Sequence, residues 1–182
     1  MDQATRIVLT GGPGFGKTTI ISALEEMGYR VKHEVAREVI KKLRNQHDDL
    51  KNSHGLEHFS HEVLLARIDQ YNEVSEGITF FDRGLPDIGG FLNKPWSGAP
   101  PFLRSACIKH PYHNRVFFTP PWPEIFTSDA ERLESLSEAI RVHDNLMQCY
   151  EALGYELVEV PHAPIKTRVM FILDQVSEWY VA

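Results

Sequence analysis

The feature that most constrains this chain is a glycine-rich segment near its amino end. It has the sequence GGPGFGKTT and consists of Gly11, Gly12, Pro13, Gly14, Phe15, Gly16, Lys17, Thr18 and Thr19. The spacing fits the P-loop pattern, in which backbone N–H groups surround the phosphates of a nucleotide. The glycines are needed because such a loop takes unusual φ/ψ values and lets the backbone approach its ligand closely. The segment therefore predicts a nucleotide-binding site formed by these nine residues.

The residues on either side of the loop have the order that a P-loop requires. Residues 6–10 form a short apolar run typical of a buried strand, and residues 18–27 have the character of a helix that ends at Gly28. Lys17 would reach the β- and γ-phosphates, and the Thr18 hydroxyl would bind Mg²⁺. We therefore expect a nucleoside triphosphate and Mg²⁺ as cofactors.

Composition limits the remaining possibilities. A chain of 182 residues with 42% hydrophobic and 24% charged residues is expected to form one soluble domain over residues 1–182. The net charge of −6 argues against nucleic acid as a main partner, because phosphate neutralisation needs a basic surface. The two cysteines, Cys107 and Cys149, fit no disulfide framework, and no apolar run approaches the length of a membrane span. We expect a cytoplasmic protein without a signal peptide or membrane span.

Strand-like and helix-like segments alternate along the chain. Further strands are predicted at residues 29–33, 78–81, 115–119 and 155–160, and helices at about 35–46, 59–76, 86–92, 129–153 and 165–179. Residues 93–114 contain four prolines and are predicted to be irregular. The alternation predicts an α/β protein with a mainly parallel five-stranded sheet between two layers of helices, the three-layer P-loop NTPase fold.

Polar residues follow the second and third predicted strands, at the carboxyl edge where a parallel sheet binds its ligands. Glu34 follows the second strand, and Arg37 comes one turn later. Asp82 and Arg83 follow the third strand, and Asp87 lies just beyond them. An apolar strand that ends in an aspartate is typical of the Mg²⁺ site of P-loop proteins. These residues predict a second part of the site, beside the P-loop.

Four segments together resemble a known group of proteins. They are the P-loop, residues 34–38 (EVARE), residues 81–87 (FDRGLPD) and residues 120–123 (PPWP). In them the chain resembles small AAA-domain P-loop proteins, which are similar to the ribosylnicotinamide kinase domain of NadR and, more distantly, to nucleoside and nucleoside-monophosphate kinases. The resemblance implies a kinase-like fold with the sheet order 2-3-1-4-5, but no particular substrate. We expect no ring-forming AAA+ motor, because Arg83 stands after Asp82 where a motor has a glutamate and an arginine cannot act as a base.

The resemblance to kinases implies a role for each polar residue. Lys17 would hold the donor phosphates, and Thr18 with Asp82 would hold Mg²⁺. Nucleoside kinases use the carboxylate after strand two as the general base, so Glu34 is our first choice and Asp82 the alternative. The acceptor would be bound by residues of the same segments: Arg37, Arg83 and Asp87.

Structural interpretations of the same residues stay open. Glu34 and Arg37 could form a surface pair of small energetic value. Asp82 could be a helix N-cap, and Arg83 could pair with a neighbouring carboxylate to support the fold.

Two segments are predicted to cover the site. Residues 93–114 would form a lid or part of the acceptor side. The segment at about 120–132 has the place of the lid over the donor in related kinases, and Arg132 would stabilise charge on the transferring phosphoryl group. Trp122 either packs into the fold or forms part of a roof over the nucleotide. Residues 161–164 (PHAP) stand where related kinases hold the nucleobase.

These observations predict a Mg²⁺-dependent kinase that transfers the γ-phosphoryl group of ATP to a small, nucleoside-like acceptor. The alternative is an ATP- or GTP-dependent switch or ATPase that acts through a protein or lipid partner, since one eukaryotic relative of the group is regarded as a GTP and phosphoinositide binder. The chain has no Asn-Lys-x-Asp guanine motif, which makes GTP the less favoured nucleotide. A kinase needs Glu34, Arg37 and Arg83 beside the γ-phosphate, whereas a switch does not.

Overall fold

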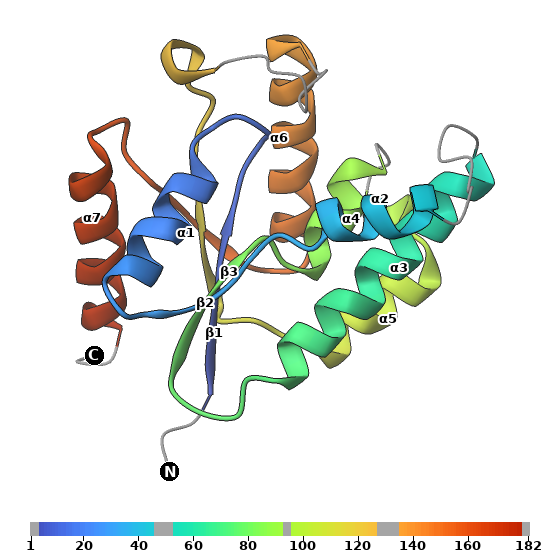
Figure 1. Ribbon diagram of the computed structural model, residues 1–182, viewed down its shortest axis with the longest axis horizontal. Coiled ribbons are helices and arrows are strands. Elements are labelled where there is room, and N and C mark those ends of the chain that lie inside the picture. Colours follow the sequence, from blue (N-terminus) through green and yellow to red (C-terminus); the bar gives the residue numbers. More distant parts are fainter. Residues whose placement is uncertain (1–3, 46–52, 93–95, 127–134, 180–182) are drawn as a thin grey trace.

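A five-stranded parallel sheet forms the centre of the molecule in the computed structural model (Figure 1). The structure describes residues 4–45, 53–92, 96–126 and 135–179. The strands are β1 (Thr5–Thr10), β2 (Arg30–Lys32), β3 (Ile78–Asp82), β4 (Arg115–Phe118) and β5 (Glu156–Glu159). Their order, β2-β3-β1-β4-β5, confirms the predicted sheet. Every neighbouring pair runs parallel, so the carboxyl ends of the strands meet at one edge.

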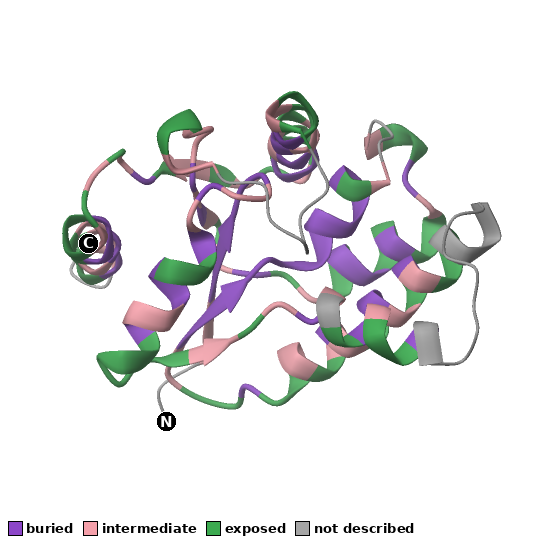
Figure 2. Ribbon diagram, turned by 45° about the horizontal axis from the view of Figure 1, so that its top comes forward, coloured by how far each residue is buried: buried purple, intermediate pink, exposed green. Residues whose placement is uncertain are grey.

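Side chains point alternately to the two faces of the sheet along the central strands, and this divides the core into two layers. In β1, Ile7 and Leu9 face one layer and Val8 faces the other, and Phe80 and Phe81 of β3 are divided in the same way. Both faces of these strands are covered by helices, which is why their sequences are apolar at successive positions. Figure 2 shows the buried residues concentrated in the central strands and on the inner sides of the helices.

Two groups of helices cover the sheet (Figure 1). One face carries α1 (Lys17–Glu26) and α7 (Ile165–Glu178). The other carries α2 (Ala36–Asn45), α3 (Ser53–Asn72), α4 (Leu85–Phe91), α5 (Pro101–Lys109) and α6 (Leu136–Ala152). Two short 3-10 helices are η1 (Trp96–Gly98) and η2 (Pro123–Ile125). The predicted three-layer architecture is confirmed. Within the described ranges, no helix has the length and apolar character needed to cross a bilayer.

The prediction that residues 93–114 are irregular is wrong for much of this segment. Pro101–Lys109 forms α5, and its buried residues Leu103, Ala106 and Cys107 belong to the same core layer as buried residues of α3 and α4. Proline suits the first position of a helix because that N–H has no intrahelical partner and the fixed φ is already helical. The Pro100-Pro101 pair therefore starts a helix, whereas the prediction took it to prevent one.

Two predicted helices have different starting points in the structure. α3 begins at Ser53, earlier than the predicted start at about residue 59. α6 begins at Leu136, where Ser135 accepts from the Glu138 N–H and the Glu138 side chain accepts from the Ser135 N–H. This capping box marks the start of the helix that was predicted from residue 129. Residues 127–134 lie outside the described part.

Close packing of α4 against α6 positions one part of the site. A Cβ on Gly90 would come 2.5 Å from Leu146 Cδ2 and 3.0 Å from the Leu146 Cα. Only glycine permits this approach of the two backbones. The contact lets Tyr150 of α6 reach Asp87 in the first turn of α4.

Candidate functional site

The P-loop connects β1 to α1 at the carboxyl edge of the sheet. Gly16 has φ of 80°, in the left-handed region that favours glycine. Lys17 is the first residue of α1, and its Nζ donates to the Gly12 carbonyl oxygen at 2.6 Å. Thr18 and Thr19 are exposed in the same turn. The loop therefore holds its lysine at the helix N-terminus, where an anion is favoured.

Lys17 lies in an environment of mixed charge. Its side chain is buried, and this burial together with the Arg83 guanidinium lowers its pKa from 10.5 to about 7. The carboxylates of Asp82, Asp87 and Glu34 act in the opposite direction. An anionic ligand at the loop would raise the pKa of Lys17 again and favour its charged form.

The P-loop rests on an aromatic support. The Phe15 ring is fully buried and lies 6.3 Å from Phe126 and 5.9 Å from His143 of α6, measured between ring centroids. The Gly12 N–H donates to His143 Nδ1 at 3.4 Å. Burial lowers the pKa of His143, which favours the neutral ring that can accept this bond. Sequence reasoning misses His143, because a single histidine on the apolar side of a helix has no distinctive spacing.

β3 ends in two charged residues with unusual surroundings. The Asp82 side chain is almost fully buried, and this burial raises its pKa although Lys17 and Arg83 partly offset the effect. Arg83 has φ of 73°, the one positive value among the described non-glycine residues, and its N–H donates to the Leu9 carbonyl at 3.0 Å. A strained backbone of this kind costs roughly 1–3 kcal/mol and is most often found at functional sites.

Glu34 follows β2 and is held by two arginines. Its Oε1 accepts from the Ala36 N–H at 3.1 Å and pairs with Arg67 Nη2, and its Oε2 pairs with Arg83 Nε at 2.6 Å. Arg67 of α3 is 2% exposed and also donates from Nη1 to the carbonyls of Asp82 (3.1 Å) and Arg83 (2.9 Å). Arg67 thus connects α3 to the ends of β2 and β3. It was not among the predicted site residues, since it lies in mid-helix where the pattern indicates only an apolar face.

Asp87 is the most fully bonded carboxylate of the site. Its Oδ1 accepts from Thr10 Oγ1 at 2.7 Å and pairs with Arg83 Nη1 at 3.0 Å. Its Oδ2 accepts from the Gly84 N–H at 2.8 Å and from the Tyr150 hydroxyl at 2.5 Å. Burial alone would raise the pKa of Asp87, but Arg83 and these hydrogen bonds outweigh it and hold the pKa below its usual value. The contacts of Asp87 are all within the fold, so its role in acceptor binding stays a prediction.

Arg83 connects the two halves of the site. Besides its pairs with Glu34 and Asp87, its Nη1 donates to the Gly11 carbonyl of the P-loop at 3.1 Å. The structural pairing left open by the sequence is therefore present. The same contacts place Arg83 between the P-loop and the carboxylate predicted as the base.

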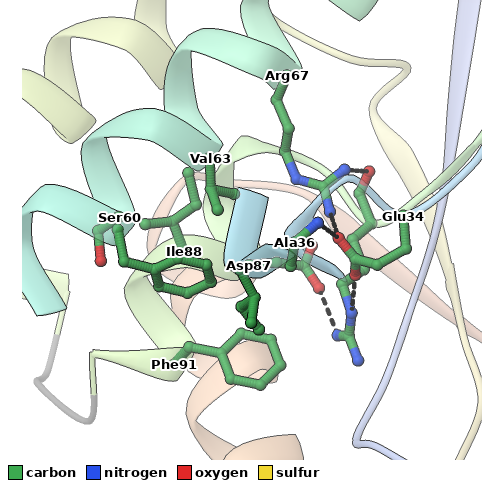
Figure 3. Close-up of a pocket in the computed structure, with 11 residues that line it drawn as sticks. Glu34, Ala36, Ser60, Val63, Arg67, Asp87, Ile88 and Phe91 are labelled. Atoms are coloured by element: carbon green, nitrogen blue, oxygen red, sulfur yellow. Dashed lines mark hydrogen bonds and ion pairs between the residues drawn. The ribbon is translucent and has the colours of Figure 1, made fainter. Parts of the chain in front are cut away.

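A pocket of about 240 Å³ opens beside this network (Figure 3). Charged groups form one end: Glu34, Arg67, Arg83 and Asp87. The other lining residues are mainly apolar: Ala36, Ile40, Phe59, Ser60, Val63, Ile88 and Phe91. Figure 3 shows Phe91, Ile88 and Val63 across the pocket from Glu34. An apolar enclosure with a few polar groups at one end is typical of a small-molecule site.

The remaining predicted residues are placed only in part. The Arg37 side chain and the whole of Arg132 lie outside the described part of the structure. Trp122 is half-buried, and its ring stacks on His162 of the loop after β5, with centroids 4.8 Å apart. The Arg168 guanidinium lies over the same ring, 5.2 Å from its centroid. The segments after β4 and β5 therefore meet beside the P-loop.

The sheet order and the site define the class of protein. A parallel β2-β3-β1-β4-β5 sheet with a P-loop after β1 and an aspartate at the end of β3 is the architecture of kinase-like P-loop proteins. The chain belongs to an AAA-domain family, because the family model described as an AAA domain matches residues 6–168. No curated protein sequence matches the chain.

Solved structures of kinases share this fold. Deoxyadenosine kinase from M. mycoides with bound dATP is 18% identical, with a TM-score of 0.67 over 95% of this chain and 99% of that one. The NadR protein in complex with NR is 17% identical, with a TM-score of 0.75 over 98% of this chain and 52% of NadR. Thymidylate kinase from Candida albicans is 12% identical, with a TM-score of 0.63 over 97% of this chain and 92% of that one. At these identities the similarity confirms the fold.

Proposed function

We propose that the chain is a Mg²⁺-dependent kinase that transfers the γ-phosphoryl group of ATP to a hydroxyl group of a small, nucleoside-like acceptor. One observation carries the proposal: Arg83 contacts the Gly11 carbonyl of the P-loop at 3.1 Å and Glu34 of the pocket at 2.6 Å. Through this one side chain, the expected phosphate site and the charged end of the pocket are adjacent. Direct phosphoryl transfer requires that donor and acceptor be held together in this way.

The shape of the pocket supports a nucleoside-like acceptor. Its volume of about 240 Å³ is small for a ligand pocket, which favours a single nucleoside-sized molecule. Phe59 and Phe91 in its walls offer aromatic surface against which a planar base could pack. The similarity to deoxyadenosine kinase, thymidylate kinase and NadR favours the same choice.

The residues of the site supply the parts of a phosphoryl transfer. The acceptor hydroxyl oxygen would attack the γ-phosphorus, the bond from that phosphorus to the β–γ bridging oxygen would break, and ADP would leave. The hydroxyl proton would pass to the Glu34 carboxylate, which Arg67 and Arg83 hold in place. Lys17 and the loop N–H groups would stabilise the charge on the phosphates. Asp82 stays the alternative base.

Thr18 and Asp82 fit a Mg²⁺ ion by their chemistry, since this ion prefers hydroxyl and carboxylate oxygens. Asp82 lies opposite Leu9 in the register of β3 and β1, so its carboxylate and the P-loop share one edge of the sheet. Bound there, Mg²⁺ would neutralise charge on the β- and γ-phosphates.

The test is ADP formation from ATP by the purified chain with Mg²⁺, alone and with a panel of nucleosides, nucleotides and nicotinamide riboside. We expect one acceptor to stimulate ADP formation and to gain a phosphoryl group by mass spectrometry. Lys17→Ala controls for contaminating enzymes, because it should abolish activity that arises at this P-loop. Slow hydrolysis that no acceptor stimulates would contradict the proposal and favour a nucleotide-dependent switch acting through a protein or lipid partner.

A further inference from the structure

Arg168, in the first turn of α7, is a buried cation, and two of its nitrogens have no hydrogen-bonding partner in the part of the chain that the structure describes. Its side chain is 7% exposed, and Nε and Nη1 have no partner among the described residues. Burial lowers the pKa of the guanidinium, and no described carboxylate offsets this effect. A buried charge without a partner destabilises a fold, so a ligand that paired with these two nitrogens of Arg168 would offset that cost.

The position of Arg168 indicates where its partner would lie. A Cβ on Gly16 would come 2.7 Å from Arg168 Nη1, so the guanidinium lies against the P-loop residue that precedes Lys17. The Trp122 ring packs against the guanidinium at 5.2 Å, and Trp122 is itself stacked on His162. A cation–π contact orients an arginine but leaves its N–H groups free to donate. The fold therefore holds a preorganised donor at the phosphate-binding loop.

The chemistry of this position favours one class of ligand. A guanidinium binds phosphate oxygens through charge-assisted hydrogen bonds. A P-loop holds α- and β-phosphates with its backbone, and its lysine serves the β- and γ-phosphates. Arg168 extends from α7 to the P-loop, on the side where the segments after β4 and β5 meet. The acceptor pocket lies on the opposite face of the sheet, where residues of α2, α3 and α4 line it. The free N–H groups of Arg168 are thus separated from the acceptor.

We propose that Arg168 is a second cation of the donor site and binds the α- or β-phosphate of the nucleotide in the P-loop. This inference rests on the proposed function, because it needs a nucleoside polyphosphate at the loop. It identifies Arg168 as a nucleotide-binding residue, and it gives a role to the two guanidinium nitrogens that have no partner among the described residues.

The experiment compares ADP affinity of the full chain by isothermal titration calorimetry for wild type, Arg168→Gln and Arg168→Lys. We expect Arg168→Gln to weaken ADP binding by about 10- to 100-fold and Arg168→Lys to recover part of the loss. Arg115→Gln is the matched control. The Arg115 guanidinium also lies over a tryptophan, 5.6 Å from the Trp179 ring centroid. Arg115, however, is the first residue of β4, and its side chain pairs with Glu156. This control should bind ADP like the wild type.

Thermal unfolding with and without ADP separates a ligand contact from a structural role. Arg168→Gln removes a buried charge that has no described carboxylate partner. We therefore expect free protein that melts no lower than wild type and a smaller rise in Tm on adding ADP. A lower Tm with unchanged ADP affinity would show that Arg168 is structural and overturn the inference. If the wild-type chain binds neither ADP nor ATP, the proposed function fails and this inference fails with it.

Discussion

The charged groups of the site are arranged differently on its donor side, which is the P-loop with Arg168, and on its acceptor side, which is the charged end of the pocket. On the donor side, Lys17 contacts only an uncharged carbonyl within hydrogen-bonding distance among the described residues, and Arg168 has two nitrogens without a described partner. On the acceptor side, two arginines and two carboxylates pair with one another: Arg67, Arg83, Glu34 and Asp87. The donor side therefore has cations without a described anionic partner, whereas each described charge of the acceptor side is paired with an opposite charge.

This difference indicates what each side recognises. A cation held at a P-loop gains an anionic partner when a phosphate chain binds, so the attraction between the two charges stabilises the complex. A pocket whose charges are internally paired offers an anion no net attraction, and binding a charged group there would disturb existing pairs. We therefore expect the donor to be a polyphosphate and the acceptor to carry no negative charge.

The largest expected effect is on turnover, from Glu34→Gln. Glutamine keeps the size of Glu34 but cannot take the hydroxyl proton, so turnover should fall by about 10²–10⁴-fold while ATP affinity stays unchanged. Glu73→Gln is the matched control, because Glu73 is an exposed carboxylate that pairs with Lys32 on the surface. Steady-state kinetics and ATP titration check both variants, and unchanged turnover in Glu34→Gln would remove this residue from the mechanism.

The next effect is on stability, from Asp87→Ala. The change would leave Arg83, the Tyr150 hydroxyl and the Gly84 N–H without their buried acceptor, and we expect unfolding free energy to fall by about 3–5 kcal/mol. Urea denaturation measures the loss. Glu156→Ala, which breaks the exposed pair with Arg115, should cost no more than about 1 kcal/mol. Equal losses in the two variants would contradict the internal pairing of the acceptor side.

A third effect is a pH dependence of ATP binding. The pKa of Lys17 is about 7 in the free protein, and phosphates should raise it, so binding takes up a proton above pH 7. Affinity should then fall as pH rises from 7 to 9, by up to about tenfold per pH unit. Calorimetry in buffers of different ionisation enthalpy measures the proton uptake. In Lys17→Arg the side chain stays charged, so ATP affinity should no longer depend on pH in this range. A pH dependence that persists in this variant would have to come from another group.

The smallest effect concerns His143 and stability in acid. Burial lowers the pKa of His143 in the folded protein. As pH falls, His143 therefore takes up its proton near pH 6.5 in the unfolded chain, and only at a lower pH in the folded protein. The stability that His143 contributes should be complete above pH 6.5 and should be lost as pH falls through its folded pKa. Thermal unfolding between pH 7 and pH 5 should show a steeper loss of stability for wild type than for His143→Gln, by about 1.4 kcal/mol for each pKa unit between the folded and unfolded states. Parallel curves would contradict this role.

The parts of the fold and site that could be predicted are those with local signals. The strand before Gly11, the glycine-rich turn and the helix from Lys17 follow from neighbouring residues, and the same holds for Asp82 at the end of an apolar strand. The sheet order came from the resemblance, and the structure confirms it.

The parts that could not be predicted depend on contacts between distant segments. Arg67 and Glu34 are 33 residues apart, and Tyr150 and Asp87 are 63 apart, so no local pattern relates them. His143 reaches Gly12 across 131 residues. The error over α5 has a different cause, because Pro101 was interpreted as a break although its position at the start of a helix makes it favourable.

The contrast between the two sides is tested most directly by the kcat/KM for a nucleoside acceptor and for its own 5′-monophosphate, measured with the same ATP and Mg²⁺. A pocket whose described charges are paired should use the nucleoside and discriminate against the monophosphate by at least about 100-fold, because the added anion meets no unpaired cation among the described lining residues. A monophosphate that is the better acceptor would contradict this contrast, since it would require an unpaired cation at the acceptor side.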